Sequence, residues 1–228
     1  MLYLVYLYFA IFVAFTAVHL YASYIKRDGL RAPTKPVILL AILGMYLEWM
    51  HMKGLDPSAI LVFALITSWL GDVLLIPHGV KWFTAGGIAF WISHALFILA
   101  YKESGIIFER LNPVVVAAVA LAYAAVVTYL FTKLKRSLPK PLFYPMYLYL
   151  LTNGAMNVFA WLRLMSGSCS VLSGFITGVG ALLFFASDCT LFFVRFDKES
   201  PIKSHFPVML AYSIGEFLIV YGLMLLEA

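Results

Sequence analysis

Two aspartates lie inside long apolar runs of this 228-residue chain, where a bare carboxylate is costly. Asp72 falls within the apolar residues 70–76, and Asp188 falls within the comparable residues 184–189. An ionisable group at membrane depth marks a functional site by default, because its burial is expensive. Two such groups in like surroundings predict a pair of carboxylates inside a helical bundle.

The depth of these groups in a membrane follows from the helical rise of 1.5 Å per residue. Counted from the nearest polar break, Asp72 lies about 7 Å and Asp188 about 10 Å from one membrane boundary. His19 lies about 10 Å from the same boundary, so the three side chains are expected to share one layer. His19 is therefore a candidate substrate-binding residue.

Four further polar residues lie deeper, roughly 17–25 Å from that boundary, near the middle of the membrane or beyond it. They are His94, Asn153, Asn157 and Glu216, and we include them as candidate substrate-binding residues. His94 would touch the aspartates only if the site is tall or the helices tilt. A structural explanation competes for all these groups, because buried polar side chains also join transmembrane helices.

The elements that must position these residues follow from the composition. Hydrophobic residues make up 64% of the chain and charged residues 12%, and the mean hydropathy is +0.95. These values indicate an all-α polytopic membrane protein with no room for a soluble domain. Polar or Pro/Gly-containing breaks leave eight apolar segments, each near the roughly 20 residues that cross a bilayer. The predicted spans of this single transmembrane domain (1–228) are about 3–24, 35–51, 57–76, 82–102, 111–133, 141–165, 169–195 and 204–227.

The basic residues are distributed unevenly between the two sides that these spans define. One side holds only Lys53, Lys102, Arg110 and Arg163. The positive-inside rule makes the richer side cytoplasmic and both termini non-cytoplasmic, in the inner membrane if bacterial or the endoplasmic reticulum if eukaryotic. The net charge of +5 then concerns topology and not nucleic acid. The richer side holds Lys26, Arg27, Arg31, Lys35, Lys81, Lys133, Lys135, Arg136, Lys140, Arg195, Lys198 and Lys203.

A faint internal repeat accompanies this pattern. The second and sixth spans both open with Lys-Pro, at Lys35 and Lys140, and Asp72 and Asp188 lie near the same ends of the third and seventh spans. Four spans per half would make two parallel repeats related by an axis along the membrane normal. The intervals between these landmarks differ in the two halves, so coincidence is the alternative. A true repeat would make the aspartates face each other near the axis.

Missing motifs exclude several enzyme classes. The chain has no G-x-S-x-G elbow and no H-E-x-x-H motif. A zinc hydrolase of the ceramidase type needs several intramembrane histidines, but only His19 and His94 lie well inside the spans, so no metal site is predicted. Intramembrane aspartyl proteases need Tyr-Asp and Gly-x-Gly-Asp, whereas Asp72 follows a glycine and Asp188 follows a serine.

Three motifs lie in the third, fourth and seventh predicted spans. They are Leu-Gly-Asp at Leu70, Gly71 and Asp72; F-x-x-G-x-x-x-F-x-x-x-H at Phe83, Gly86, Phe90 and His94; and G-A-x-L-F-x-x-S-D at Gly180, Ala181, Leu183, Phe184, Ser187 and Asp188. Together with the eight-span length, these motifs resemble the lysoplasmalogenase (YhhN-like) family of integral membrane proteins, over the whole chain. The last span departs from the family, which tends to Tyr-Tyr-x-Ala-Gln where this chain has residues 212–216 and ends on Glu216. Phe97 stands where the family is expected to have tyrosine.

The resemblance implies hydrolysis of the vinyl-ether bond of lysoplasmalogens to a fatty aldehyde and a glycerophospho-base. Protonation of the β-carbon gives an oxocarbenium ion, and water then adds. A pair of carboxylates suits this chemistry, as it does in glycosidases, so Asp72 and Asp188 are the candidate catalytic residues. The implied partners are a lysophospholipid substrate and membrane lipids, and no metal or organic cofactor is required.

Two lysines are candidates for holding the phosphate of such a substrate. Lys35 and Lys140 each precede a proline that opens a predicted span, where the helix N-terminus adds partial positive charge. Ordinary topology signals are the competing explanation, more strongly for Lys140 than for Lys35. A different function also fits the residues, namely a lipid-binding or transport protein that uses the carboxylates for proton coupling. A third possibility is hydrolysis or isomerisation of another ether or ester lipid.

Overall fold

The computed structural model describes residues 2–135, 137–197, 199 and 202–225. Within them the chain forms eight α-helices and two short 3₁₀ helices, so the all-α prediction is confirmed. The helices are α1 (Leu2–Tyr24), α2 (Asp28–Lys53), α3 (Ala59–Leu74), α4 (Val80–Glu103), η1 (Phe108–Arg110), α5 (Pro113–Leu134), η2 (Lys140–Leu142), α6 (Phe143–Met165), α7 (Val171–Phe196) and α8 (Phe206–Met224).

Six of these helices, namely α1, α2, α4, α5, α7 and α8, are long and apolar enough to cross a membrane. The chain is therefore a helical membrane protein. The other two helices lie among them in the bundle. α3 has 16 residues, and α6 carries Asn153, Asn157 and Arg163 along its 23 residues, which lowers its hydropathy. The short length of α3 and the polar residues of α6 explain why length and composition alone do not identify these two helices.

Helix starts fall at the breaks that the sequence marked. Ser58, Asn112 and Ser170 are N-caps whose side-chain oxygens accept backbone N–H bonds from the first turns of α3, α5 and α7. Such caps satisfy amide groups that have no partner inside the helix. At the end of α2, Gly54 has φ of 68°, a left-handed conformation that glycine adopts without strain.

The start of α2 differs from the prediction. The helix begins at Asp28 and not at residue 35, and it contains both Pro33 and Pro36. Thr34 lies between them, and its hydroxyl bonds the Leu30 and Arg31 carbonyl oxygens at 2.8 and 3.1 Å. Leu30 and Arg31 lie next to the carbonyls of Gly29 and Ala32, which lose their amide partners because Pro33 and Pro36 have no N–H. Lys35 is therefore two turns inside α2, where the partial charge of the helix N-terminus has faded.

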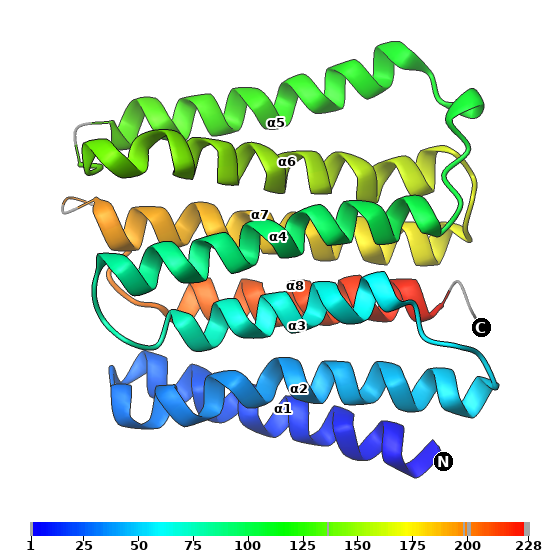
Figure 1. Cartoon of the computed structure of the whole chain (residues 1–228), viewed down its shortest axis with the longest axis horizontal. Helices are drawn as coiled ribbons and strands as arrows, with labels where there is room; N and C mark the ends of the chain where they lie inside the picture. Colours follow the sequence, from blue (N-terminus) through cyan, green and yellow to red (C-terminus); the bar gives the residue numbers. More distant parts are fainter. Residues whose placement is uncertain (1, 136, 198, 200–201, 226–228) are drawn as a thin grey trace.

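The helices form a flattened bundle in which α1 and α2 make one edge and α5 and α6 the other, with α3, α4, α7 and α8 between them (Figure 1). Equivalent helices of the two halves run in the same direction, as α1 and α5 show. Contacts follow the same correspondence, because α2 packs on α8 and α6 packs on α4. This arrangement matches the predicted parallel halves related by an axis along the helices.

The connections α1–α2, α3–α4, α5–α6 and α7–α8 all lie at one end of the bundle, which we call the basic end (Figure 1). The two chain termini lie toward the other end. The basic side predicted from the sequence maps to this end. Two of its residues, Arg136 and Lys198, lie outside the described residues, as does the last part of the final predicted span.

Close contact between α7 and α8 depends on two glycines. A Cβ on Gly180 would lie 2.8 Å from the Gly215 carbonyl oxygen, and one on Gly215 would lie 2.9 Å from the Gly180 carbonyl oxygen. Small residues let transmembrane helices approach in this way. In the sequence, Gly86-Gly87 and Gly174/Gly178 also predict close helix contact. At Gly86, Gly174 and Gly178 a Cβ would meet neighbouring side chains, but at Gly87 it would meet nothing within 4 Å, so the prediction is wrong for Gly87.

At the end of the bundle opposite the basic end, one buried arginine connects neighbouring helices. Arg163 of α6 donates to the Ser104 and Thr177 hydroxyls at 2.7 Å each and to the Ser173 hydroxyl at 3.3 Å. Ser173 in turn donates to the Gly222 carbonyl oxygen at 2.6 Å. These residues come from the end of α4, the first turns of α7 and the last turn of α8. Hydrogen bonds therefore tie four helices together at this end.

Candidate active site

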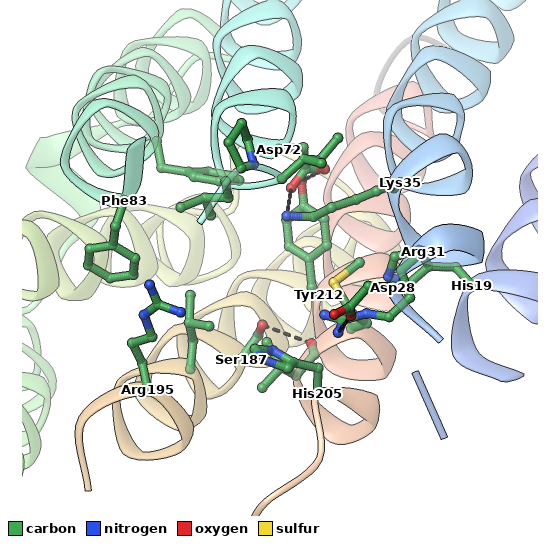
Figure 2. Close-up of a pocket in the computed structure, with 18 of the residues that line it drawn as sticks. His19, Asp28, Arg31, Lys35, Asp72, Phe83, Ser187, Arg195, His205 and Tyr212 are labelled. Carbon is green, nitrogen blue, oxygen red and sulfur yellow. Dashed lines mark hydrogen bonds and ion pairs between the residues drawn. The ribbon is translucent and has the colours of Figure 1, made fainter. Parts of the chain in front are cut away.

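Both aspartates line one cavity of about 270 Å³ near the basic end of the bundle. Figure 2 shows its polar residues, which come from α1, α2, α3, α7 and α8. Asp72 is 1% exposed and Asp188 is 6% exposed. The structure therefore brings the two predicted carboxylates to the same space, and neither is packed away on its own side of the bundle.

Asp72 has an ionic partner. Lys35 Nζ lies 3.0 Å from Asp72 Oδ1, and the Tyr212 hydroxyl donates to Asp72 Oδ2 at 2.8 Å (Figure 2). Lys35 comes from α2, in the same half of the chain as Asp72, whereas Tyr212 comes from α8 in the other half. The sequence predicted Lys35 close to the layer of Asp72, and the structure adds that its ammonium group pairs with the carboxylate.

Asp188 has neutral hydrogen-bond donors. The Tyr149 hydroxyl and the Asn153 amide donate to Asp188 Oδ2 at 2.6 and 2.7 Å. His94 Nε2 lies 3.6 Å from the same oxygen, slightly beyond hydrogen-bond length. Tyr149 and Asn153 come from α6, and His94 comes from α4 in the other half of the chain. The described hydrogen bonds all reach one carboxyl oxygen, so the other oxygen is left for a proton or a ligand.

His94 lies closer to the aspartates than its estimated depth suggested. It is 14 residues from the start of α4, and Asp188 is 8 residues from the end of α7. Side chains tilt toward the N-terminus of their helix, and α4 starts at the basic end while α7 ends there, so His94 and Asp188 lean toward each other and meet despite the difference in backbone depth. The ring is fully buried between Tyr149 and Phe184, with centroids 5.0 and 5.1 Å away, and neither ring nitrogen hydrogen-bonds to a described residue.

The other predicted residues differ in their relation to the site. His19 lines the cavity, and its Nδ1 is 2.9 Å from the Thr34 hydroxyl. Asn157 supports the site indirectly, because its amide donates to the Asn153 side-chain oxygen at 3.1 Å. Glu216 is fully buried one turn beyond Tyr212 and is not among the described residues that line the cavity. Lys140 is exposed on η2, away from the cavity.

The mouth of the cavity is rich in cationic and imidazole groups. Arg31 lines it and pairs with Asp28 at 2.7 Å, and Arg195 extends over the Phe83 ring at 5.6 Å (Figure 2). His205, just before α8, faces the same space. Burial lowers the pKa of His205 to about 4, and the nearby Arg31 and Lys35 charges lower it further in the same direction. This mouth suits an anionic group.

A family comparison agrees with this geometry. Residues 30–223 match the model of the YhhN family. The chain belongs to the YhhN family. No curated protein and no solved structure matches the chain. The YhhN match includes both aspartates and every contact residue named for them, so the resemblance predicted from three short motifs is confirmed.

Sequence reasoning missed several residues of this YhhN-family site. Tyr149 was not singled out, although Tyr149, Asn153 and Asn157 recur at four-residue intervals and therefore share one helix face. Tyr212 was noted only within a motif. Arg31 and Arg195 were counted as topology signals, and no local pattern distinguishes a cation that lines a cavity from one that faces solvent.

Proposed function

We propose that this protein hydrolyses the vinyl-ether bond of lysoplasmalogens, releasing a fatty aldehyde and glycerophosphoethanolamine or glycerophosphocholine. The observation that best supports the proposal is that two buried carboxylates with unlike partners line one cavity. Vinyl-ether hydrolysis needs a proton donor, an anion beside the oxocarbenium ion and a base for water. Membership of the YhhN family supports the same reaction class.

We assign the proton donor to Asp188. Tyr149 and Asn153 hold its Oδ2, so Oδ1 carries the proton that is transferred to the β-carbon of the vinyl ether. The π electrons of the double bond form the new C–H bond, and the α-carbon becomes an oxocarbenium ion.

We assign the stabilising anion to Asp72, because the Lys35 ammonium group provides its counter-charge. Water adds to the α-carbon and gives its proton to Asp188, which restores the acid and leaves a neutral hemiacetal. The hemiacetal then loses its hydroxyl proton, the C–O bond to glycerol breaks, and the glycerol oxygen takes up a proton. One water is consumed, and the products are an aldehyde and an alcohol.

We assign the binding of the substrate phosphate to the cationic mouth of the cavity. Lys35 was the sequence-based candidate, but its ammonium group is engaged with Asp72. Arg31 and Arg195 line the same cavity nearer the basic end, and guanidinium groups bind phosphate oxygens in pairs. Replacing either arginine should raise KM for a phosphate-bearing substrate more than for a neutral alkenylglycerol.

The test is the release of product by purified protein in detergent or vesicles. A 1-alkenyl lysophospholipid should give free fatty aldehyde, the saturated 1-alkyl analogue should give none, and Asp188→Asn should abolish the signal. Absence of aldehyde from folded wild-type protein would reject the hydrolase. Proton-coupled movement of the lipid between vesicle leaflets would then identify the transport alternative.

A further inference from the structure

A second cavity, of about 450 Å³, lies on the flank of the bundle between α4 and α6, with α7 as its floor. Gly87 and Trp91 line it from α4, and Tyr144 and Leu148 line it from α6. Tyr144 is 79% exposed and Leu148 is 51% exposed, so the cavity opens on the side of the bundle that faces lipid. We call this cavity the flank groove.

The flank groove adjoins the cavity of the aspartates. Leu75, Phe83, Phe90, Asp188 and Leu191 line both. Asp188 is the one charged group among the described residues that line the flank groove, whereas the first cavity is bordered by several cations. Asp188 therefore marks the boundary between a polar space at the basic end and an apolar space on the flank.

Building on the proposed function, we propose that the flank groove binds the hydrocarbon chain of the substrate and that the substrate enters sideways from the bilayer between α4 and α6. A single-chain lysophospholipid fits both spaces, because it joins one anionic head to one apolar chain. With its phosphate at the cationic mouth and its chain in the groove, the bond between them lies beside Asp188. The chain then stays in apolar surroundings throughout binding.

The far end of the groove limits how much of the chain it holds. From Phe83 to Trp91 the groove follows α4 for about 12 Å. Trp91 Nε1 donates to the Thr152 hydroxyl at 2.8 Å, which ties α4 to α6 at that end. The groove therefore receives the part of the chain nearest the vinyl ether, and the remainder extends into the bilayer.

Gly87 provides a way to fill the groove without disturbing the fold. A Cβ added there meets nothing within 4 Å, so Gly87→Trp places its indole in the open space of the groove. Ala120 is exposed on α5, outside the groove, so Ala120→Trp adds the same side chain to another lipid-facing surface as a matched control.

Photo-cross-linking tests the groove without requiring turnover. The probe is a saturated 1-O-alkyl lysophosphocholine with a diazirine in the first part of its chain, at trace level in phosphatidylcholine vesicles. Label is expected in peptides of residues 80–92 and 142–150, suppressed by excess unlabelled probe lipid and by Gly87→Trp but not by Ala120→Trp. Even, non-competable labelling of all lipid-facing helices would overturn the proposal.

Kinetics with two chain lengths give the second measurement. Gly87→Trp should lower kcat/KM for a hexadecenyl substrate by at least about tenfold, as displacement of roughly two buried methylenes would do. A butenyl substrate should be hydrolysed at nearly the wild-type rate. Equal losses for both substrates would overturn the groove. Correct cross-links without any aldehyde release would instead reject the hydrolase and leave a lipid-binding groove.

Discussion

The surroundings of Asp72 and Asp188 share a plan but differ in chemistry. Each carboxylate is contacted by the preceding helix of its own half and by the last helix of the other half: α2 and α8 for Asp72, and α6 and α4 for Asp188. Each accepts one tyrosine hydroxyl. Asp72 also has the Lys35 ammonium group, whereas Asp188 has the Asn153 amide and the His94 imidazole.

This difference shows how two nearly symmetric halves of the chain can place their aspartates in chemically different surroundings. Opposite charge favours the ionised form of a carboxylate more strongly than hydrogen bonds from neutral donors do, so Asp188 holds a proton more readily than Asp72. In the proposed reaction the two halves thus provide an anion and an acid. The predictions that follow test this division, and they are arranged from the largest expected effect to the smallest.

The carboxylates themselves should matter most. Asp188→Asn and Asp72→Asn should each lower kcat by about 10²–10⁴-fold, the usual contribution of a general acid or base. Product assays beside thermal unfolding of the same preparations check this. A variant that keeps both the wild-type rate and the wild-type Tm would remove that aspartate from the mechanism.

Loss of the Lys35–Asp72 ion pair should lower the folding stability, whereas Asp188 has no such pair to lose. Lys35→Met leaves a buried carboxylate without its partner, a loss of about 3–5 kcal/mol for a buried pair. The double variant Lys35→Met/Asp72→Asn should regain much of the lost Tm but not the activity. If Lys35→Met is as stable as wild type, the pair has no structural role. The matched change at Asp188 is Asn153→Leu, which removes a neutral donor and should lower the Tm less than Lys35→Met does.

Removing one tyrosine hydroxyl from each aspartate, that of Tyr149 or that of Tyr212, compares the two sites. Tyr212→Phe should lower kcat by about 10- to 100-fold, because a hydrogen bond to a charged group contributes about 1.5–3 kcal/mol. Tyr149→Phe should lower kcat by about tenfold or less, because a hydrogen bond to the protonated Asp188 contributes about 0.5–1.5 kcal/mol. Tyr149→Phe should also shift the pH–rate profile of the acid, while Tyr212→Phe should shift that of the anion. Identical profiles for the two variants would contradict separate roles.

The smallest effect concerns the mouth of the cavity. The pKa of His205 falls from 6.5 to about 4 on folding, so the unfolded chain binds a proton that the folded protein does not between these values. Folding stability should therefore decline as pH falls through this window. His205→Gln should lose less Tm than wild type between pH 7.5 and pH 5. Parallel losses would show that other groups cause the decline.

The sequence predicted the elements well because apolar length and polar breaks act locally. All eight helices form, and Asp72 and Asp188 line one cavity. The start of α2 was misjudged because Pro36 resembles a helix start, whereas the helix opens at Asp28 and continues through Pro33 and Pro36. A local rule places proline in the first helical turn and does not recognise a helix that continues through two prolines.

The arrangement of partners around each aspartate could not be predicted, because it depends on which helices are neighbours and on the direction in which their side chains lean. Depth counting placed His94 apart from Asp188, yet they lie 3.6 Å apart. The flank groove is also invisible in the sequence. Gly87 and Leu148 are ordinary residues of apolar helices, and they form a groove only because α4 and α6 separate near the basic end.

Arg163 and its partners Ser104, Ser173 and Thr177, which we call the Arg163 cluster, connect the helices at the end of the bundle opposite the basic end. The cluster fastens α4, α6 and α7 near Ser104, and about 32 Å of α4 separates Ser104 from Phe83 at the groove. A tilt of α4 by about 5° around that anchor would move Phe83 by roughly 3 Å and Ser104 hardly at all, as a lever does. The Trp91–Thr152 hydrogen bond lies between them and would limit such a tilt. Any widening of the flank groove by this tilt would therefore be largest near Phe83 and smallest near Ser104.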